Sequence, residues 1–315
     1  MMENKKFLVS ATPHLKRSMS AQAQSLVLIC SLLLCGVFAI SFYGLPALWI
    51  VLAGVASSYL FDMFFSYIFL GHFNFKDLTG VISGLVLSLI MPVGIPVYFV
   101  VIASLIAILF AKVMFGGQGK ELVNGAALGA CVLYCIVAGF GTTLFAASTV
   151  NGAVASPLEV FASNGYSGIS IVDLLMGQAG GAIGASCALC ALVGGIIVCA
   201  SGVFDYYIPI GAIVAFVITI LFSKGANAIL PELLSGSFLF VTFFMLPSHA
   251  SHPALWPSKL VYCIGFGVLA AVMRQTYLFG EVGVFFCLLL VNILSPFLDM
   301  LVGMLYRGRR VKKYE

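Results

Sequence analysis

Charged side chains are scarce in this sequence. Asp, Glu, Lys and Arg make up only 8% of its 315 residues, whereas 62% of the residues are hydrophobic. A soluble domain with so few charges would expose apolar surface on every face, so this composition excludes an ordinary soluble protein. The mean hydropathy of +1.15 supports the same conclusion. The sequence therefore predicts an integral membrane protein.

Signals of several other protein classes are also missing. The chain contains no Gly-rich phosphate-binding loop, no metalloprotease motif and no nucleophile elbow. Its basic residues form no patch of the kind that binds nucleic acid. Given the apolar composition, the expected surrounding partner is membrane lipid. Residues 1–20 are basic and polar but lack a small-residue cleavage site, so the first apolar run is expected to stay in the chain.

Apolar segments long enough for membrane helices recur along the chain. A helix needs about 20 apolar residues to cross a hydrocarbon core of roughly 30 Å, and backbone in lipid must satisfy its own hydrogen bonds. The ten expected spans lie near residues 24–43, 46–70, 78–92, 95–115, 122–145, 171–202, 207–223, 231–247, 259–275 and 281–305. The third and eighth are short, and Gly177, Gly180, Gly181 and Gly184 interrupt the sixth. Transporter-like folds use such broken segments to line a cavity, and the predicted fold is all-α.

The distribution of Lys and Arg predicts the orientation, because these residues are retained on the cytoplasmic side. With a cytoplasmic N-terminus, the ten spans leave only Lys224 and Arg274 of the 15 basic residues on the outer side. Both termini are then cytoplasmic, with an N-terminal segment at 1–23 and a basic tail at 306–315. Residues 146–170 contain no Lys or Arg. They are expected to form an extracytoplasmic loop between a first membrane repeat, 24–145, and a second, 171–305.

Two similar segments suggest an internal repeat. SGLVLSLIMP begins at Ser83 and SGSFLFVTFFMLP begins at Ser235, and each is followed by a Phe-Gly turn and then by an Asn, Asn124 or Asn292. Halves of five spans each must be inverted relative to one another, because five is an odd number. The expected architecture is two inverted five-helix repeats, similar to a urea transporter, with the two Ser-Gly segments meeting near the midplane. Chance similarity between apolar segments is the alternative.

Short motifs occur in one order along most of the chain. They are SATPHLKRSMS near the N-terminus, Asp77 with Thr79-Gly80 and Ser83-Gly84, KVMFGGQG from Lys112, Asn124, Leu234-Ser235-Gly236, Phe244-Met245, Arg274, Gly280-Glu281 with Gly283, and NILSPFLD ending at Asp299. Together they resemble the RnfD and NqrB subunits of ion-translocating electron-transport complexes, RnfD most of all. The chain resembles a divergent member, because an acidic family segment is replaced around His249 and His252, which are expected in a solvated cytoplasmic loop.

The resemblance implies a flavin mononucleotide (FMN) joined through its phosphate to a hydroxyl in the extracytoplasmic loop. The family motif matches residues 153–158, so Ser156 would carry the flavin beside Ala155, Pro157 and Leu158. The acidic residue that usually lies upstream is missing. Thr149, and after it Ser148, are the fallback hydroxyls, and an ordinary loop serine at position 156 is the alternative.

The resemblance also implies a function. The chain would pass electrons in a ferredoxin:NAD-type translocating oxidoreductase, coupled to Na⁺ or H⁺ movement, and would have no complete activity alone. Its location would be a bacterial or archaeal cytoplasmic membrane. Expected partners are the other Rnf-type subunits and a flavin transferase, and riboflavin or a second non-covalent flavin is a further cofactor candidate. A redox-silent channel or transporter and a flavin-free assembly subunit are the alternatives.

Ionisable groups inside membrane spans are costly and often mark ion routes. Asp62 and Asp299 lie within predicted spans, and with Asp77 they are candidates for an ion path. Acids at span ends are expected to be helix-end charges or caps; they are Asp77, Asp173, Asp205, Glu232 and Glu281. The pairs Cys187/Cys190 and Cys131/Cys135 permit an iron–sulfur cluster, although buried cysteines in membrane helices more often only pack.

Overall fold

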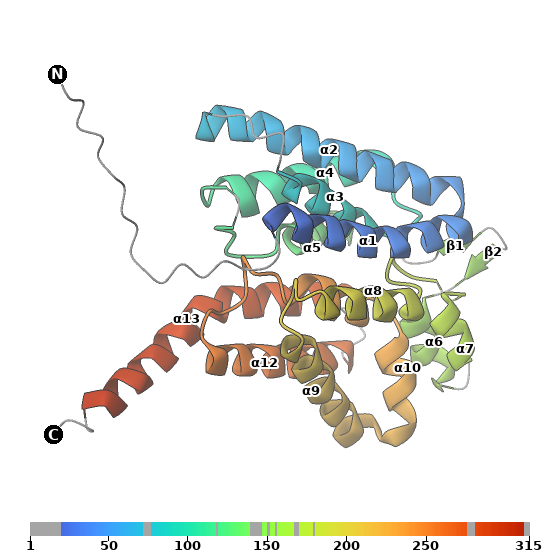
Figure 1. Ribbon diagram of the computed structural model, residues 1–315. Helices are drawn as coiled ribbons and strands as arrows, with labels where there is room; N and C mark the ends of the chain where they lie inside the picture. Colours follow the sequence, from blue (N-terminus) through green and yellow to red (C-terminus); the bar gives the residue numbers. More distant parts are fainter. Residues whose placement is uncertain are drawn as a thin grey trace.

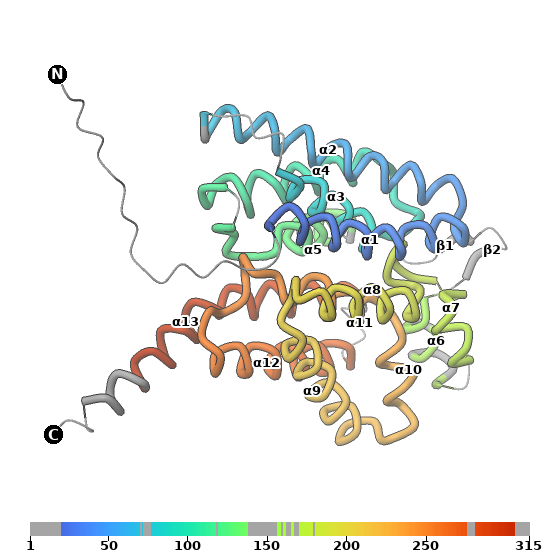
Figure 2. The backbone as a smooth tube through the Cα atoms, viewed as in Figure 1, coloured from blue at the N-terminus to red at the C-terminus, as the bar shows by residue number. Residues whose placement is uncertain are grey.

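The computed structural model describes residues 20–71, 77–117, 119–138, 147–149, 152–154, 156–166, 170–178, 180–275 and 281–311. These residues form a helical molecule with one small hairpin, so the all-α class is confirmed (Figure 1). The chain trace runs through one group of helices, then through the hairpin and two short helices, and then through a second group (Figure 2).

The first group contains five helical segments. They are α1 (Ala21–Tyr43), α2 (Leu45–Leu70), α3 (Thr79–Leu89), α4 (Val97–Ile106) with its π-helical continuation η1 (Ala107–Val113), and α5 (Gly125–Ala138). The Ser20 side chain caps α1 by accepting a hydrogen bond from the Ala23 amide. A single residue, Gly44, reverses the chain between α1 and α2 with φ of 73°, a conformation that favours glycine.

The second group follows the connecting elements. Strands β1 (Ala147–Thr149) and β2 (Gly152–Val154) form an antiparallel hairpin, and α6 (Pro157–Asn164) and α7 (Ile171–Met176) follow it. The second group itself comprises α8 (Ala188–Ala200), α9 (Tyr207–Lys224), η3 (Ala226–Ala228), α10 (Ile229–Leu234), α11 (Phe238–Phe240), η4 (Val241–Met245), α12 (Trp256–Gln275) and α13 (Gly283–Val311).

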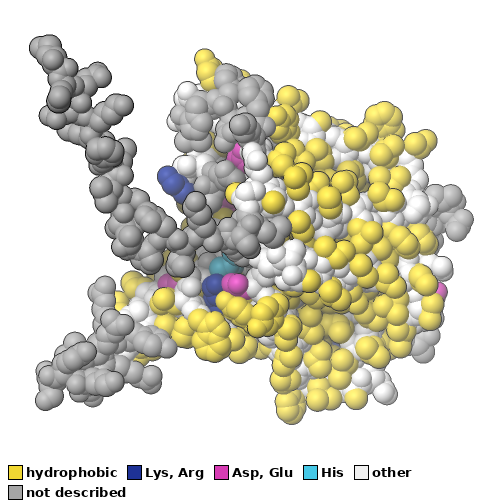
Figure 3. Space-filling model, in the orientation of Figure 1, with side chains coloured by type: hydrophobic (Ala, Val, Ile, Leu, Met, Phe, Trp, Pro, Cys, Tyr) yellow, Lys and Arg dark blue, Asp and Glu magenta, His cyan; other side chains and the backbone are white. Residues whose placement is uncertain are grey.

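Five of the described helices are long and apolar enough to cross a membrane: α1, α2, α9, α12 and α13. The segments 226–234 and 238–245 pass together as one span bent by 69°, and four further apolar helices are shorter. Apolar side chains cover most of the visible face in Figure 3, whereas most visible charged side chains gather on its left. The chain is therefore a multi-pass membrane protein.

The predicted sixth span, 171–202, is interrupted between α7 and α8, in the region of its glycines. Gly177 ends α7 in a left-handed conformation, and Cys187 begins α8 by accepting a hydrogen bond from the Cys190 amide. The break at the glycines was predicted, but its length was not. In the eighth span, Gly236 adopts φ of 60° at the bend between α10 and α11.

Non-helical backbone near the middle of the fold pairs across the two groups. The end of α3 forms an antiparallel bridge with the segment before α8: the Ile183 amide donates to the Met91 carbonyl at 2.9 Å, and the Gly184 amide donates to Leu89 at 2.7 Å. This pairing satisfies backbone groups that lipid would leave without partners. The first Ser-Gly segment, which was predicted to meet the second near the midplane, here pairs through its end with the segment before α8.

The α9–α12 interface depends on small residues, and it gives a testable prediction. A Cβ added to Gly267 would overlap the Ala212 carbonyl and come within 2.9 Å of the Ala215 Cβ, whereas nothing lies within 4 Å of one added to Gly265. We expect Gly267→Ala to lower the free energy of unfolding by about 1–3 kcal/mol, because the helices must separate. Thermal unfolding in detergent measures the effect. Gly265→Ala is the matched control, and equal stability of the two variants would contradict the close packing.

Candidate functional site

The predicted attachment residue, Ser156, lies immediately before α6. Its residue is 2% exposed, and its backbone carbonyl accepts the first helical hydrogen bond from the Val160 amide at 3.1 Å. Pro157 is also buried and Leu158 is partly buried. Ala155 is outside the described residues, while the fallback residues Ser148 and Thr149 lie in β1, opposite Ala153 and Gly152.

The start of a helix is favourable for a phosphate ester. Helix N-termini carry a partial positive charge and free backbone amides, which stabilise anions. Pro157 at the first helical position suits this place, because its fixed φ fits a helix start and it has no amide to leave unpaired. A phosphodiester on the Ser156 hydroxyl would therefore be attached where one negative charge is tolerated, although the residue is buried.

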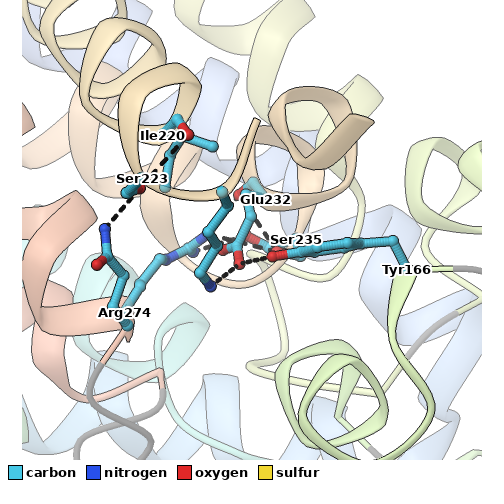
Figure 4. A network of polar contacts seen from close by, with 8 residues as sticks. Tyr166, Ile220, Ser223, Glu232, Ser235 and Arg274 are labelled. Carbon is cyan, nitrogen blue, oxygen red and sulfur yellow. Dashed lines mark hydrogen bonds and ion pairs between the residues drawn. The ribbon is translucent and has the colours of Figure 1, made fainter. Parts of the chain in front are cut away.

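A second set of polar residues, which we call the α10 charge network, lies close to α6 (Figure 4). Its members are Tyr166, Lys224, Glu232, Ser235 and Arg274. One Glu232 carboxylate oxygen accepts a hydrogen bond from the Tyr166 hydroxyl at 3.0 Å and pairs with the Lys224 ammonium at 2.6 Å. The Arg274 guanidinium lies 3.7 Å from the other oxygen. Glu232 and Arg274 are almost fully buried, with side chains 1% and 0% exposed, so the charges compensate each other away from water.

The bend between α10 and α11 connects this network with the start of α6. The Arg274 guanidinium donates to the backbone carbonyls of Glu232 and Ser235. A Cβ added to Gly236 would lie 3.0 Å from the Arg274 Nη2 atom and 3.7 Å from the Leu158 side chain. The first turn of α6 and the guanidinium therefore contact the same glycine.

The first half contains a comparable cluster, which we call the α3 charge network. The buried Lys112 ammonium lies 2.7 Å from the Asp62 carboxylate, 3.3 Å from Asp77 and 2.5 Å from the Thr79 hydroxyl. Asp77 also accepts from the Thr79 amide at the start of α3. Asp62 and Asp77, predicted as ion-path residues, are thus brought together. Asp299 is not part of this contact set: it accepts from the amides of Ala254 and Leu255 just before α12.

A cavity of about 250 Å³ lies between the two groups of helices. Its walls include Thr79 and Ser83 from α3, Glu121 from the turn before α5, and Phe244 and His249 from the second group. His249 lies against the Val203 carbonyl at 2.6 Å and contacts His252. Both Ser-Gly segments thus border one polar-edged cavity, and His249 is an exposed residue of the loop before α12 that lies in the cavity wall.

The Glu121 carboxyl has a raised pKa. Burial raises its pKa from 4.5 to about 7; the Lys112 charge opposes this shift, and the Asp62 and Asp77 carboxylates add to it. Because its pKa is higher in the folded chain than in the unfolded chain, protonated Glu121 contributes to the free energy of unfolding. This contribution is full below about pH 4.5 and is lost as the pH rises through 7.

This shift predicts a pH-dependent stability. We expect the melting temperature of the unmodified chain to fall between pH 5 and pH 8 more steeply than that of Glu121→Gln, which cannot ionise. Thermal unfolding of both proteins in detergent across this range measures the difference. Parallel curves would contradict the assignment of the transition to Glu121.

Metal-site expectations receive no support from the described residues. Within them, no group of three or more His, Cys, Asp or Glu side chains is placed to hold a metal ion. Cys187 instead caps α8 and donates to the Leu175 carbonyl.

Sequence reasoning missed the α10 charge network as a site, and it missed Lys112 as the partner of Asp62 and Asp77. It treated Glu232 and Glu281 as helix-end charges at the interface, but both are buried, at 1% and 3% exposed. It also placed Lys224 and Arg274 only as outer basic residues. A usable signal was present: Lys112 and Arg274 each come shortly before the Phe-Gly turn of a predicted repeat.

The chain is similar in sequence to known proteins. The chain is 25% identical over 310 residues to a component of the proton-translocating ferredoxin:NAD(+) oxidoreductase complex of Clostridium ljungdahlii, covering 93% of each chain. It is 27% identical over 310 residues to the corresponding component of the Na(+)-translocating complex of Acetobacterium woodii, covering 97% of this chain and 96% of the relative. It is 26% identical over 249 residues to a component of the Na(+)-translocating NADH-quinone reductase of Chromohalobacter salexigens, covering 74% and 60%. The family model described as NQR2, RnfD, RnfE matches residues 8–305. The chain therefore belongs to the NQR2, RnfD, RnfE family.

Proposed function

We propose that this chain is a membrane subunit of an ion-translocating ferredoxin:NAD-type oxidoreductase and that it carries FMN on Ser156. The relatives that cover nearly its whole length are subunits of complexes with that activity. The observation that carries the flavin assignment is the position of Ser156, directly before Pro157 and at the N-terminus of α6. The family membership favours this function over a redox-silent channel.

The residues around Ser156 fit a phosphate-linked group. The hydroxyl supplies the ester oxygen, the helix start tolerates the negative charge, and Pro157 and Leu158 exclude water from the attachment point. A bound flavin supplies one-electron chemistry. The protein fixes where this chemistry occurs, because α6 is held against the α10 charge network.

The proposed membrane arrangement is ten spans in two inverted halves, with both termini cytoplasmic. Support comes from the two charge networks. In each, a buried cation at the end of a helix, Lys112 or Arg274, contacts an acid and a hydroxyl near a Ser-Gly segment. The C-terminal end of α2 lies on the left of Figure 1 and α10 lies on the right, so the two networks are at opposite ends of the helices, as expected for inverted repeats.

The two sides then have different roles. Residues 146–170 with Ser156 face outward, and the α3 charge network lies on the cytoplasmic side. We assign Na⁺ or H⁺ passage to the neighbourhood of Asp62 and Asp77, because buried carboxylates in membrane proteins stabilise cations. The cavity bordered by Glu121 and His249 is the candidate site for riboflavin or another non-covalent flavin, since its lining combines apolar side chains such as Phe244 with polar groups that could bind the edge of a flavin ring. Asp299, which binds backbone amides, is assigned no part in this path.

Attachment requires partners. A flavin transferase would modify Ser156, and the other components of the complex would deliver and remove electrons. The test is to express the full chain with a bacterial flavin transferase, separate it on a denaturing gel and record flavin fluorescence. Mass spectrometry of the chain should then show one added FMN. A colourless chain of unmodified mass would exclude the covalent flavin and would favour the flavin-free assembly subunit.

A further inference from the structure

The attachment residue is inaccessible in the folded chain. Ser156 is 2% exposed, and the α6 helix that begins beside it contacts the second group of helices through Leu158, which lies near Gly236. An enzyme that joins a flavin to the Ser156 hydroxyl must bring a phosphorus atom into bonding distance of it. The attachment reaction therefore needs a state in which the start of α6 has moved away from its packed position.

The α10 charge network holds α6 in that packed position from both ends. Beyond the C-terminal end of the helix, the Tyr166 hydroxyl donates to the Glu232 carboxylate at 3.0 Å, and the Lys224 ammonium lies over the Tyr166 ring at 5.9 Å. At the N-terminal end, Leu158 lies near Gly236, and the Arg274 guanidinium and the Glu281 side chain lie near the same glycine. Glu232 belongs to both attachments, because its carboxylate binds Tyr166 and its backbone carbonyl binds Arg274.

We propose that the Tyr166–Glu232 contact is a latch that controls how often Ser156 opens for flavin attachment. This inference rests on the proposed function at Ser156. Glu232 and Tyr166 are positioning residues: they act through α6 and contribute no atom to the new bond.

Flavin adenine dinucleotide can serve as the donor in the attachment reaction. The Ser156 Oγ atom attacks the FMN phosphorus of flavin adenine dinucleotide, forming the Oγ–P bond. The P–O bond to adenosine monophosphate breaks, and that nucleotide leaves with the electron pair while the serine proton goes to solvent. No oxidant or reductant is needed. The latch affects only the fraction of chains in which the hydroxyl is reachable.

The test uses Tyr166→Phe, which removes the hydroxyl but keeps the ring that packs on Phe161 at 5.2 Å. A hydrogen bond to a charged group restrains local opening, so its loss should raise the open population about tenfold. Hydrogen exchange at the Val160 and Phe161 amides should rise by that factor in the unmodified chain. The initial rate of flavin attachment to the full chain in membranes, with transferase and flavin adenine dinucleotide, should rise similarly.

Tyr206→Phe is the control, because this tyrosine is 65% exposed at the start of α9; it should change neither rate. Hydrogen exchange at the amides of α1, which is far from the latch in sequence, should stay unchanged in Tyr166→Phe, which separates loss of the latch from general damage to the fold. Unchanged or slower attachment in Tyr166→Phe, with normal attachment in the unmodified sequence, would overturn the latch and leave the flavin site intact. Absence of attachment to the unmodified sequence would instead overturn the proposed function, while the exchange measurement would still report on the latch.

Discussion

Replacing Ser156 with alanine should abolish covalent flavin attachment. The phosphoester needs an oxygen nucleophile, and Ser156 supplies the hydroxyl at the start of α6, where the helix dipole favours the added negative charge. Alanine removes the oxygen and leaves the helix, since Pro157 still begins it. In-gel flavin fluorescence after expression with a flavin transferase should fall to background, and the chain should keep its unmodified mass.

Three further variants make this result specific. Thr149→Ala and Ser148→Ala remove the fallback hydroxyls in β1 and should leave the fluorescence unchanged. Ser156→Thr keeps an oxygen at the same place and should retain the flavin. Full labelling of Ser156→Ala would show that attachment is elsewhere, and loss of labelling only in Thr149→Ala would move the site to the hairpin.

Replacing Lys112 with methionine should destabilise the protein by about 3–5 kcal/mol, because the substitution leaves two buried carboxylates without their cation. The Lys112 side chain is 3% exposed, and those of Asp62 and Asp77 are 7% and 12% exposed. Methionine fills a similar volume, so the effect isolates the charge. The free energy of unfolding in detergent at pH 7 measures it.

The control for this prediction is Lys120→Met, because Lys120 is exposed in the following turn. That change should have little effect, since exposed charges contribute little to stability. Adding Asp62→Asn and Asp77→Asn to Lys112→Met should restore part of the lost stability by removing the uncompensated charges. If Lys112→Met were as stable as Lys120→Met, the α3 charge network would not be a stabilising unit.

The helices were largely predictable because long apolar runs have one solution in lipid. Gly44 and Gly177 mark helix ends that the apolar pattern already suggested. The limits of the helix breaks were harder to predict. The break between α7 and α8 pairs with the backbone at the end of α3, which lies far away in sequence. Local propensity carries no information about that partner.

The candidate site was predictable only in part. The position of Ser156 followed from a motif, but its burial did not, since burial depends on how α6 packs. The ion pairs joining Lys112 to Asp62 and Arg274 to Glu232 connect residues 50 and 42 positions apart. Charge counting placed these cations at membrane boundaries, whereas their partners come from helices that bend or end inside the fold.

The bridge between the end of α3 and the segment before α8 also bears on how the chain is made. A nascent chain that ends before Ile183 has no partner for the Met91 and Leu89 carbonyls. The first half therefore cannot reach its final form during synthesis until the start of the second half has emerged and inserted. The two halves supply hydrogen-bond partners for each other's backbone, so they assemble together even though they are synthesised in order.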